Sequence, residues 1–415
     1  MRRALAAWRA LAGLGLAGAA AAGAEPTVIQ LSWDGVRHDY PQRVGARAPA
    51  LARLAAEGAR AERLLPVFPS STFPGHVSLA TGTFPDRHGI VDNRFFDRER
   101  GVFRMANDAS WIEAEPLWAA AERQGVPAAV FFWVGSETDW RGVGARHRKA
   151  PFDSGIGEAE KVRQILAWLD LPGPDRPRLV MAWWHGADRA GHRAGPDDES
   201  VDAALAEQDA HLADLLAGLD ARGLWDETTL LLVSDHGMTR VRGEVPVRDH
   251  LAASGLPATV HSGAAVAHVF LDDPARADAV RRSLSSLRHV RVFAGAELPA
   301  ALRLRHPTRT GDFVVLAEPG WVFRGTSLRH RAWRWLAGWF GSDTGMHGYA
   351  PDHPDMGGVL LARGRGVSAG TRLGAVRMVD VAPTVAALLG IDPPRHAEGE
   401  PIQDLLPRSA DGRGP

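Results

Sequence analysis

Seven side chains with the chemistry of metal ligation occur at separate points in the sequence, most of them where a short apolar run ends. They are Asp34, Thr72, Asp188, His192, Asp235, His236 and His347. Carboxylate, hydroxyl and imidazole ligands without sulfur fit catalytic zinc, with manganese or iron as alternatives. An Asp after a strand often only caps the next helix, so no single residue carries the inference. Their joint placement predicts a centre for two metal ions.

Thr72 lies in the stretch 68–82, Phe-Pro-Ser-Ser-Thr-Phe-Pro-Gly-His-Val-Ser-Leu-Ala-Thr-Gly. The pattern predicts that Thr72 is the N-cap of a short helix, because Pro74 suits a first helical turn. A hydroxyl there faces free N–H groups and the positive end of the helix dipole. This position suits an anionic phosphate, or an alkoxide held by a metal.

Two pairs of candidate ligands are close in sequence. Asp188 and His192 have i, i+4 spacing, but Gly186 and Gly191 favour a turn over a helix. Neighbours on an extended segment point to opposite sides, so an adjacent Asp-His pair at 235–236 can share an ion only at a turn. The glycine that follows the pair permits one.

The ligands require elements that bring them together. Apolar runs predict core strands, and amphipathic spacing predicts helices between them. The strands are 28–33, 61–67, 127–133, 178–184, 228–233 and 357–362, and the helices are 45–59, 115–125, 156–170, 198–221 and 380–390. Crossovers of this length imply a mainly parallel sheet with helices on both faces. Ligand sites of such sheets lie at the carboxyl ends of the strands, where Asp34, Asp188 and Asp235 fall.

The regular alternation of predicted strands and helices is interrupted between residues 240 and 342. Shorter β-like runs at 264–271, 289–294 and 313–317, with one helix near 275–287, predict an inserted α+β cap. The catalytic core is then 25–239 and 343–404, and 405–415 is a flexible tail. The cap ends in a segment, 330–340, that contains Trp333, Trp335 and Trp339. Buried packing is a better explanation for these rings than a substrate cleft or membrane contact.

Bulk properties exclude several classes of protein. The 415 residues carry 48 basic and 49 acidic side chains, which gives no reason to expect specific binding of nucleic acid. The absence of cysteine excludes disulfides and thiolate ligands. Residues 1–24 read as a secretory signal peptide, too short and too weakly apolar to span a membrane. We expect export by the Sec or Tat route with no membrane span in the mature chain, to the periplasm if the source is Gram-negative.

Several segments resemble the nucleotide pyrophosphatase/phosphodiesterase branch of the alkaline phosphatase superfamily. They are Ser-Trp-Asp-Gly (32–35), Phe-Pro-Ser-Ser-Thr-Phe-Pro-Gly-His (68–76), Thr-Gly-Thr-Phe-Pro-Asp-Arg-His-Gly-Ile-Val-Asp-Asn (81–93), Glu-Pro-Leu-Trp (115–118), Phe-Phe-Trp-Val-Gly-Ser-Glu (131–137), Asp-Arg-Ala-Gly-His (188–192), Ser-Asp-His-Gly-Met (234–238) and His-Gly-Tyr (347–349). They occur in the order typical of the family. The resemblance implies an alkaline-phosphatase-like three-layer α/β/α core with an inserted cap, and hydrolysis of phosphodiester or pyrophosphate bonds in a small-molecule substrate.

The resemblance also implies residue roles. Asp34, Thr72, Asp235 and His236 would surround one Zn²⁺, and Asp188, His192 and His347 would hold the other. Thr72 would be the nucleophile of a phospho-threonine mechanism, activated by the first zinc. Asn93 would donate a hydrogen bond to a phosphoryl oxygen, and Phe73 and Trp183 would bind the substrate's nucleoside by stacking or, equally, serve in core packing. His185 departs from the glutamate common in the family, which leaves the substrate preference open.

Three alternatives differ in testable ways. A type I sulfatase is disfavoured because position 72 is neither Cys nor Ser. A Thr-dependent phosphomonoesterase or phosphonoacetate-hydrolase-like enzyme would bind the extra negative charge of its substrate with added Lys or Arg, and the segment 110–116 offers no lysine. A non-catalytic secreted metal- or sugar-binding module would not need an intact nucleophile beside two ligand sets.

Overall fold

The structure of the chain is a computed structural model that describes residues 25–324 and 344–407. The predicted signal peptide, residues 1–24, lies outside the described residues, as do Trp333, Trp335 and Trp339 and the last part of the predicted tail. No helix in the described ranges is long and apolar enough to cross a bilayer.

An eight-stranded sheet forms the centre of the larger part of the molecule, in the order β18-β2-β17-β8-β1-β7-β5-β6. The strands are β1 (Thr27–Trp33), β2 (Ala59–Leu65), β5 (Ala128–Phe131), β6 (His147–Lys149), β7 (Leu179–Trp184), β8 (Thr228–Val233), β17 (Leu360–Gly364) and β18 (Thr371–Arg377). Every neighbouring pair is parallel except those that involve β17. The predicted mainly parallel sheet is therefore confirmed.

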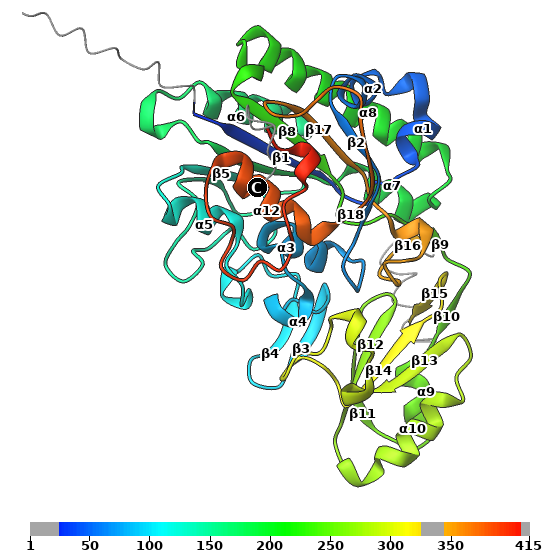
Figure 1. The fold of residues 1–415 in the computed structure, drawn as a ribbon. Helices are drawn as coiled ribbons and strands as arrows, with labels where there is room; N and C mark the ends of the chain where they lie inside the picture. Colours follow the sequence, from blue (N-terminus) through cyan, green and yellow to red (C-terminus); the bar gives the residue numbers. More distant parts are fainter. Residues whose placement is uncertain (1–24, 325–343, 408–415) are drawn as a thin grey trace, which may run out of the picture.

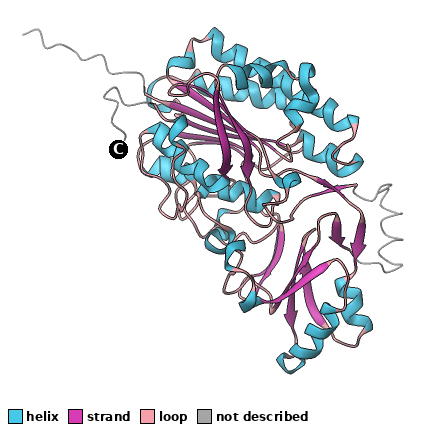
Figure 2. Ribbon diagram, turned by 45° about the vertical axis from the view of Figure 1, so that its right-hand side comes forward, coloured by secondary structure: helices cyan, strands magenta, loops and turns pink. Residues whose placement is uncertain are grey.

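Helices cover both faces of this sheet, which gives the predicted three-layer α/β/α arrangement (Figure 1, Figure 2). One layer contains α1 (Tyr40–Val44), α2 (Pro49–Ala56), α6 (Glu158–Leu169) and α8 (Glu199–Ala221). The other contains α3 (Thr72–Thr81), α4 (Pro85–His88), α5 (Leu117–Arg123) and α12 (Val381–Leu389). The helix α7 (Gly186–Ala194) follows β7 directly.

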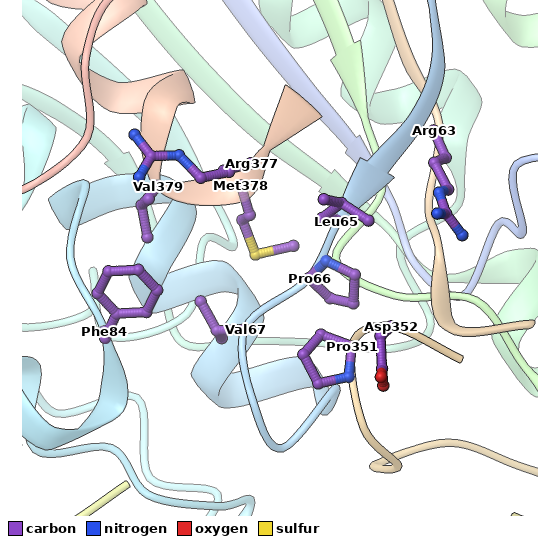
Figure 3. Close-up of a pocket in the computed structure, with 10 residues that line it drawn as sticks. All are labelled: Arg63, Leu65, Pro66, Val67, Phe84, Pro351, Asp352, Arg377, Met378 and Val379. Carbon is purple, nitrogen blue, oxygen red and sulfur yellow. The ribbon is translucent and has the colours of Figure 1, made fainter. Parts of the chain in front are cut away.

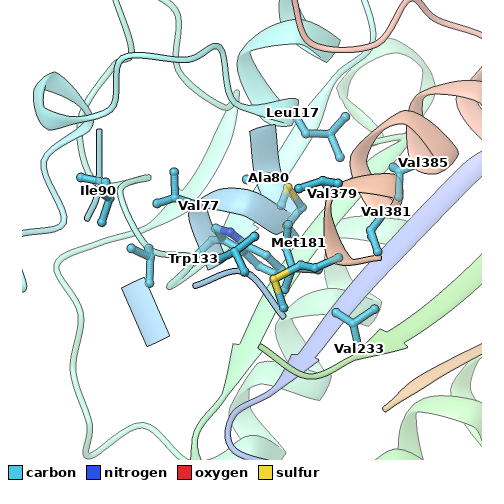
Figure 4. Close-up of a cluster of buried hydrophobic side chains, with 14 of the residues drawn as sticks. Val77, Ala80, Ile90, Leu117, Trp133, Met181, Val233, Val379, Val381 and Val385 are labelled. Carbon is cyan, nitrogen blue, oxygen red and sulfur yellow. The ribbon is translucent and has the colours of Figure 1, made fainter. Parts of the chain in front are cut away.

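The sheet alternates its apolar side chains between the two layers. Val28 of β1 packs with the α3, α5 and α12 layer, and Ile29 packs with the α2, α6 and α8 layer. This is the period of two that a strand imposes. Figure 4 shows part of the α3, α5 and α12 layer, where Ala80 of α3 lies beside Val379, just ahead of α12. Each fully buried aliphatic side chain contributes roughly 1.5–3 kcal/mol, so this packing fixes α3, the helix that carries Thr72.

A smaller sheet follows in the chain and lies beside the core (Figure 1). Its order is β11-β12-β14-β13, from strands β11 (Ala258–Ser262), β12 (Val266–Leu271), β13 (Val290–Ala294) and β14 (Phe313–Ala317), all paired antiparallel. The helices α9 (Val247–Ala253) and α10 (Ala277–Ser285) pack on it. Short pairs join β10 (Gly243–Val245) to β15 (Trp321–Phe323), and β3 (Arg94–Asp97) to β4 (Gly101–Arg104).

The chain leaves the core and returns to it at neighbouring strands. The strand β9 (Thr239–Arg240) pairs antiparallel with β16 (Gly345–Met346), which places the two connections side by side. This pairing supports the division into a core of 25–239 and 343–404 and an inserted cap of 240–342, which we retain as a proposal.

Some element boundaries differ from the prediction. The predicted helix 45–59 is a short 3-10 helix at 45–47 followed by α2, because Pro49 starts a new helix at its first position. The predicted strand 61–67 begins two residues earlier and ends at Leu65, because Pro66 offers no N–H for a ladder. The short strand β6 and the edge strand β18 were not predicted, since neither has an uninterrupted apolar run.

Candidate metal centre and nucleophile

Three adjacent strands deliver the carboxylates. Asp34 follows β1, Asp188 lies in α7 after β7, and Asp235 follows β8. Because β1 pairs in parallel with both β7 and β8, their carboxyl ends meet at one edge of the sheet. The strand order thus explains why three carboxylates that are far apart in sequence come together.

Three separate segments of the chain place imidazole rings at the same edge of the sheet. His192 lies in α7, His236 follows Asp235, and His347 follows β16. The rings of His236 and His347 stack with centroids 3.7 Å apart, and the centroids of His192 and His347 are 5.1 Å apart. The structure therefore brings all six predicted acids and imidazoles into one cluster.

The predicted turn at residues 186–191 is wrong, because these residues are part of the helix α7. Gly191 is accommodated inside the helix since it packs closely against its neighbours: a Cβ there would lie 2.5 Å from the Met238 Sδ. The helix puts Asp188 and His192 on one face, one turn apart. Their Oδ1 and Nε2 atoms are 3.3 Å apart.

Thr72 is the first residue of α3, and Ser71 is its N-cap, so the prediction that Thr72 itself is the cap is wrong by one residue. Pro74 falls at the third helical position, where the N–H it lacks would in any case have no partner within the helix. The Thr72 Oγ1 lies 3.3 Å from the His236 Nε2. The side chain therefore points toward the cluster from the N-terminal end of a ten-residue helix.

The protonation pattern of the three histidines fits metal ligation. His192, His236 and His347 each place Nδ1 at 2.9–3.0 Å from a backbone carbonyl oxygen, those of Gly345, Gly237 and Ser70 respectively. A carbonyl only accepts, so each Nδ1 carries the proton and each Nε2 presents a lone pair. The three Nε2 atoms lie near carboxylate oxygens that also only accept. Acceptors facing acceptors at such distances need a proton or a metal cation between them.

Some carboxylate oxygens in the cluster also lack a hydrogen-bond donor. Asp34 Oδ1, Asp188 Oδ1 and Asp235 Oδ2 are buried and have no hydrogen-bond partner among the described residues. Burial, together with the neighbouring carboxylates of Asp235 and Asp188, raises the pKa of Asp34 well above its ordinary value. Burial also acts to raise the pKa of Asp188, and only positive charge close by, such as protonated rings of His192 and His347, would outweigh burial and lower that pKa. Crowded acids of this kind are stabilised by bound cations.

Two groups of ligand atoms are compact enough to hold an ion. Asp188, His192 and His347 form one group, and Asp34, Asp188 and His236 form the other, with all ligand atoms of a group within 4.8 Å of one another. Asp188 is common to both. Asp235 lies beside the second group, with Oδ2 3.2 Å from the His236 Nε2.

The predicted substrate residues lie around this cluster. The Asn93 Oδ1 accepts a hydrogen bond of 2.8 Å from the Phe73 N–H, which leaves the amide NH₂ of Asn93 for another acceptor. Phe73 is only 3% exposed and packs edge-on against Phe103. Trp183 is 8% exposed, and its indole N–H donates to the Asp34 Oδ2 at 3.0 Å. In this conformation both rings are covered mainly by protein, and their predicted contact with a nucleoside stays a prediction.

Sequence reasoning did not single out His76 as a site residue. His76 is fully buried in α3, and its Nδ1–H donates to the Thr72 carbonyl at 2.8 Å and lies 3.3 Å from the Asp235 Oδ2. Its Nε2 accepts from the Ser32 hydroxyl at 2.9 Å. His76 thus ties the helix of Thr72 to a candidate ligand. The i, i+4 spacing of Thr72 and His76 was the available signal.

An apolar cavity of about 300 Å³ lies elsewhere, next to the segment that precedes Thr72 (Figure 3). Val67, Phe84, Met378 and Val379 line it, with charged side chains such as Arg377 at its edges. None of the predicted ligands contributes to it. Apart from Arg63, Asp352 and Arg377, the side chains that line it are apolar.

Comparisons with known proteins agree with this geometry. Residues 28–350 match the model of a family described as type I phosphodiesterase / nucleotide pyrophosphatase. The chain is 29% identical to the bis(5′-adenosyl)-triphosphatase of Xenopus laevis over 377 residues, which is 88% of this chain and 78% of the relative. It is 31% identical to an uncharacterized pyrophosphatase/phosphodiesterase of Schizosaccharomyces pombe over 362 residues, or 82% and 71% of the two chains.

A solved structure has the same fold. It is the murine ectonucleotide pyrophosphatase/phosphodiesterase 5, in an inactive threonine-to-alanine form in complex with AMP. The two chains superpose with a TM-score of 0.83 at 24% identity, over 92% of this chain and all of the murine one.

Proposed function

Because the chain belongs to the type I phosphodiesterase/nucleotide pyrophosphatase family, it is a metal-dependent hydrolase of phosphodiester or pyrophosphate bonds, and we propose that Thr72 is its nucleophile. The observation that carries this proposal is the approach of the Thr72 Oγ1 to the His236 Nε2, at the N-terminus of α3 and beside buried carboxylates that lack partners. A hydroxyl in these surroundings is placed for attack on phosphorus.

We infer that the cluster holds two Zn²⁺ ions, with Mn²⁺ or Fe as alternatives. Asp34, Asp235 and His236 would hold one, and Asp188, His192 and His347 the other. The unpartnered carboxylate oxygens and the outward Nε2 lone pairs support this set. When bound, such cations lower the pKa of a nearby hydroxyl and compensate the charge of phosphoryl oxygens.

The residues of the chain perform the transfer in two steps. The Thr72 Oγ1 forms a bond to phosphorus as the bond from phosphorus to the leaving oxygen breaks, which gives a phosphoryl ester of Thr72. Water then attacks the same phosphorus and releases the Thr72 oxygen. The Asn93 NH₂ donates to a non-bridging oxygen in both steps, since its Oδ1 is fixed by the Phe73 N–H.

Two arginines beside Asn93 point to an anionic leaving group. Arg94 and Arg104 are directly opposite each other in the β3–β4 hairpin, and both are exposed. Like charges that face each other across two paired strands repel. We infer that phosphates of a nucleoside polyphosphate or dinucleotide relieve this repulsion.

The relatives support a nucleotide substrate and an extracytoplasmic location. By their names, the Xenopus relative acts on a bis(5′-adenosyl) triphosphate and the murine one is an ectoenzyme that binds AMP. We propose a small nucleotide-type diester as the substrate of this chain. We further propose export through the predicted signal peptide 1–24, to the periplasm if the source is Gram-negative.

The test compares wild type with Thr72→Ala and Thr72→Ser, loaded with zinc, on a p-nitrophenyl phosphodiester and on the corresponding monoester. We expect diester turnover that falls at least about 1,000-fold in Thr72→Ala and is partly retained in Thr72→Ser. Dominant monoester turnover would favour the phosphomonoesterase alternative. No turnover of either ester, with metal bound, would favour the non-catalytic module.

A further inference from the structure

The tip of the β11–β12 hairpin, residues 262–265, reaches from the smaller sheet to the segment around the nucleophile. Gly263 closes the turn, with its N–H donating to the Val266 carbonyl at 3.0 Å. A Cβ on Gly263 would lie 2.1 Å from the Asp92 Oδ2 and 2.7 Å from its Cγ. No side chain fits in that space, so the backbone of the hairpin is packed directly against the Asp92 carboxyl group.

Asp92 connects the hairpin to both neighbours of the reacting groups. It is 2% exposed, and its Oδ1 accepts from the Asn93 N–H at 2.7 Å. The Ser71 side chain is near enough to lower the pKa of this carboxyl, against the larger effect of burial. Ser71 precedes Thr72, and the Asn93 side chain holds the Phe73 N–H. The buried Asp92 carboxyl is thus next to Ser71, which precedes Thr72, and it accepts from Asn93. The Asn93 side chain in turn holds Phe73, which follows Thr72.

The hairpin tip approaches Ser71 from a second side. Gly348, next to His347, has a φ of +98°, and a Cβ on it would lie 3.2 Å from the Ser71 Oγ and 3.4 Å from the Ala265 Cβ. The tip therefore touches Asp92 through Gly263 and Gly348 through Ala265. Ser71 contacts both of these partners.

The environment of Asp92 costs stability. Among the described residues it has no cationic partner, and burial raises its pKa to about 7. A buried carboxyl without a counter-charge is unfavourable, so the contacts of Asp92 with Ser71 and Asn93 are kept at the expense of stability.

We propose that Asp92 is a positioning residue, through which the tip of the β11–β12 hairpin holds Ser71 and Asn93, and with them Thr72, in the geometry needed for phosphoryl transfer. The proposal rests on the function proposed for Thr72. The smaller sheet would then contribute to catalysis, because the tip of its β11–β12 hairpin packs on Asp92 and thereby helps to position Thr72.

The expected effects follow from the contacts. Asp92→Ala removes the acceptor of the Asn93 N–H and the partner of Ser71, and should lower kcat by roughly 10- to 100-fold with KM changed by less than about threefold. Asp92→Asn keeps an amide oxygen for the Asn93 N–H and should restore most of kcat. Gly263→Ala should mimic Asp92→Ala because its methyl group displaces the carboxyl. The effects of Ser71→Ala and Asp92→Ala should be less than additive, since both variants remove the contact between these two side chains.

The controls separate positioning from folding. Asp209 is a matched buried carboxyl in α8 that accepts from the Ala50 and Leu51 N–H groups at 2.9 and 2.7 Å, in the other helix layer. Asp209→Ala should lower the melting temperature and leave kcat of the folded fraction unchanged. Gly157→Ala is the control for Gly263→Ala, because a Cβ on Gly157 meets nothing within 4 Å.

The experiment measures steady-state kinetics on the diester, with amide hydrogen exchange over residues 66–79 and 90–96. A selective loss of kcat in Asp92→Ala, recovery in Asp92→Asn and faster exchange in both segments would support the proposal. Wild-type kcat in folded Asp92→Ala, or a loss that only tracks the unfolded fraction as in Asp209→Ala, would overturn it. If wild type turned over no diester, the function proposed for Thr72 would be wrong. The positioning role of Asp92 would still be tested by amide hydrogen exchange, and unchanged exchange in Asp92→Ala would overturn it.

Discussion

At the scale of single residues, the orientation of three imidazole rings decides whether the cluster can bind metal ions. Each ring donates one hydrogen bond from Nδ1–H to a backbone carbonyl. This bond orients the ring so that Nε2 points toward the carboxylates. The carbonyls come from Ser70, Gly237 and Gly345, none of which belongs to the predicted ligand set. Composition and spacing indicate the ligands, but these supporting carbonyls become visible only in the folded chain.

The role of Arg94 and Arg104 gives a prediction about the substrate. Replacing either by Gln should raise KM for a dinucleoside triphosphate about tenfold, since a hydrogen bond to a charged group contributes roughly 1.5 kcal/mol. The KM for a p-nitrophenyl diester, whose leaving group lacks further phosphates, should change little. Arg163→Gln on the exposed face of α6 is the control. Equal effects on both substrates would contradict an interaction with the leaving group.

At the scale of elements, strand order does most of the positioning. The predicted strands 28–33, 178–184 and 228–233 are β1, β7 and β8, with β1 between the other two in the sheet, and each ends just before a candidate ligand. The sequence pattern was sufficient for this because buried parallel strands read as continuous apolar runs. It failed at α7, where the glycines that favoured a turn are instead sites of close packing. It also placed the start of α3 one residue late, since both Ser71 and Thr72 are good caps.

The contact between α7 and β16 provides a test at this scale. A Cβ on Gly345 would lie 2.3 Å from the Gly191 carbonyl oxygen, so Gly345→Ala should push β16 away from α7. His192 would lose the carbonyl that orients it. We expect bound zinc to fall from two ions per chain toward one, measured by metal analysis after gel filtration, with diester turnover reduced in parallel.

Gly157→Ala serves again as the control and should keep both ions. Two tightly bound ions in Gly345→Ala would contradict the assignment of His192 to a metal.

At the scale of the whole molecule, the larger sheet supplies the candidate ligands and the smaller sheet touches the segment around Thr72. The shorter predicted strands after residue 240 indicate a separate unit, but no local sequence pattern reveals that the turn at Gly263 packs on Asp92. That contact joins residues 171 positions apart, and it depends on how the two sheets meet. Long-range packing of this kind lies beyond what periodicity and motif can predict.

Stability of the whole chain should depend on pH through His88. This ring is fully buried, with its Nε2–H donating to the Ser78 hydroxyl and its Nδ1 accepting from the Ile90 N–H. Burial, with a smaller effect of Arg309, lowers the pKa of His88 to about 3. A lowered folded-state pKa means that stability is complete above the unfolded pKa of about 6.5 and is lost as pH falls toward 3.

Urea unfolding should therefore show that wild type loses roughly 2 kcal/mol more than His88→Gln between pH 7 and pH 5. His38→Gln, at a partly exposed position, should follow wild type. The same pH dependence in wild type and His88→Gln would contradict a neutral buried imidazole.

The central claim is that the Thr72 oxygen forms a covalent bond to phosphorus during turnover. Mass spectrometry of the zinc enzyme, quenched in acid during steady-state hydrolysis of a nucleotide diester, tests it most directly. We predict a nucleotidyl group on the peptide that contains Thr72, absent when Thr72→Ala is treated in the same way. Turnover by wild type without any adduct on that peptide, together with undiminished turnover by Thr72→Ala, would contradict the mechanism.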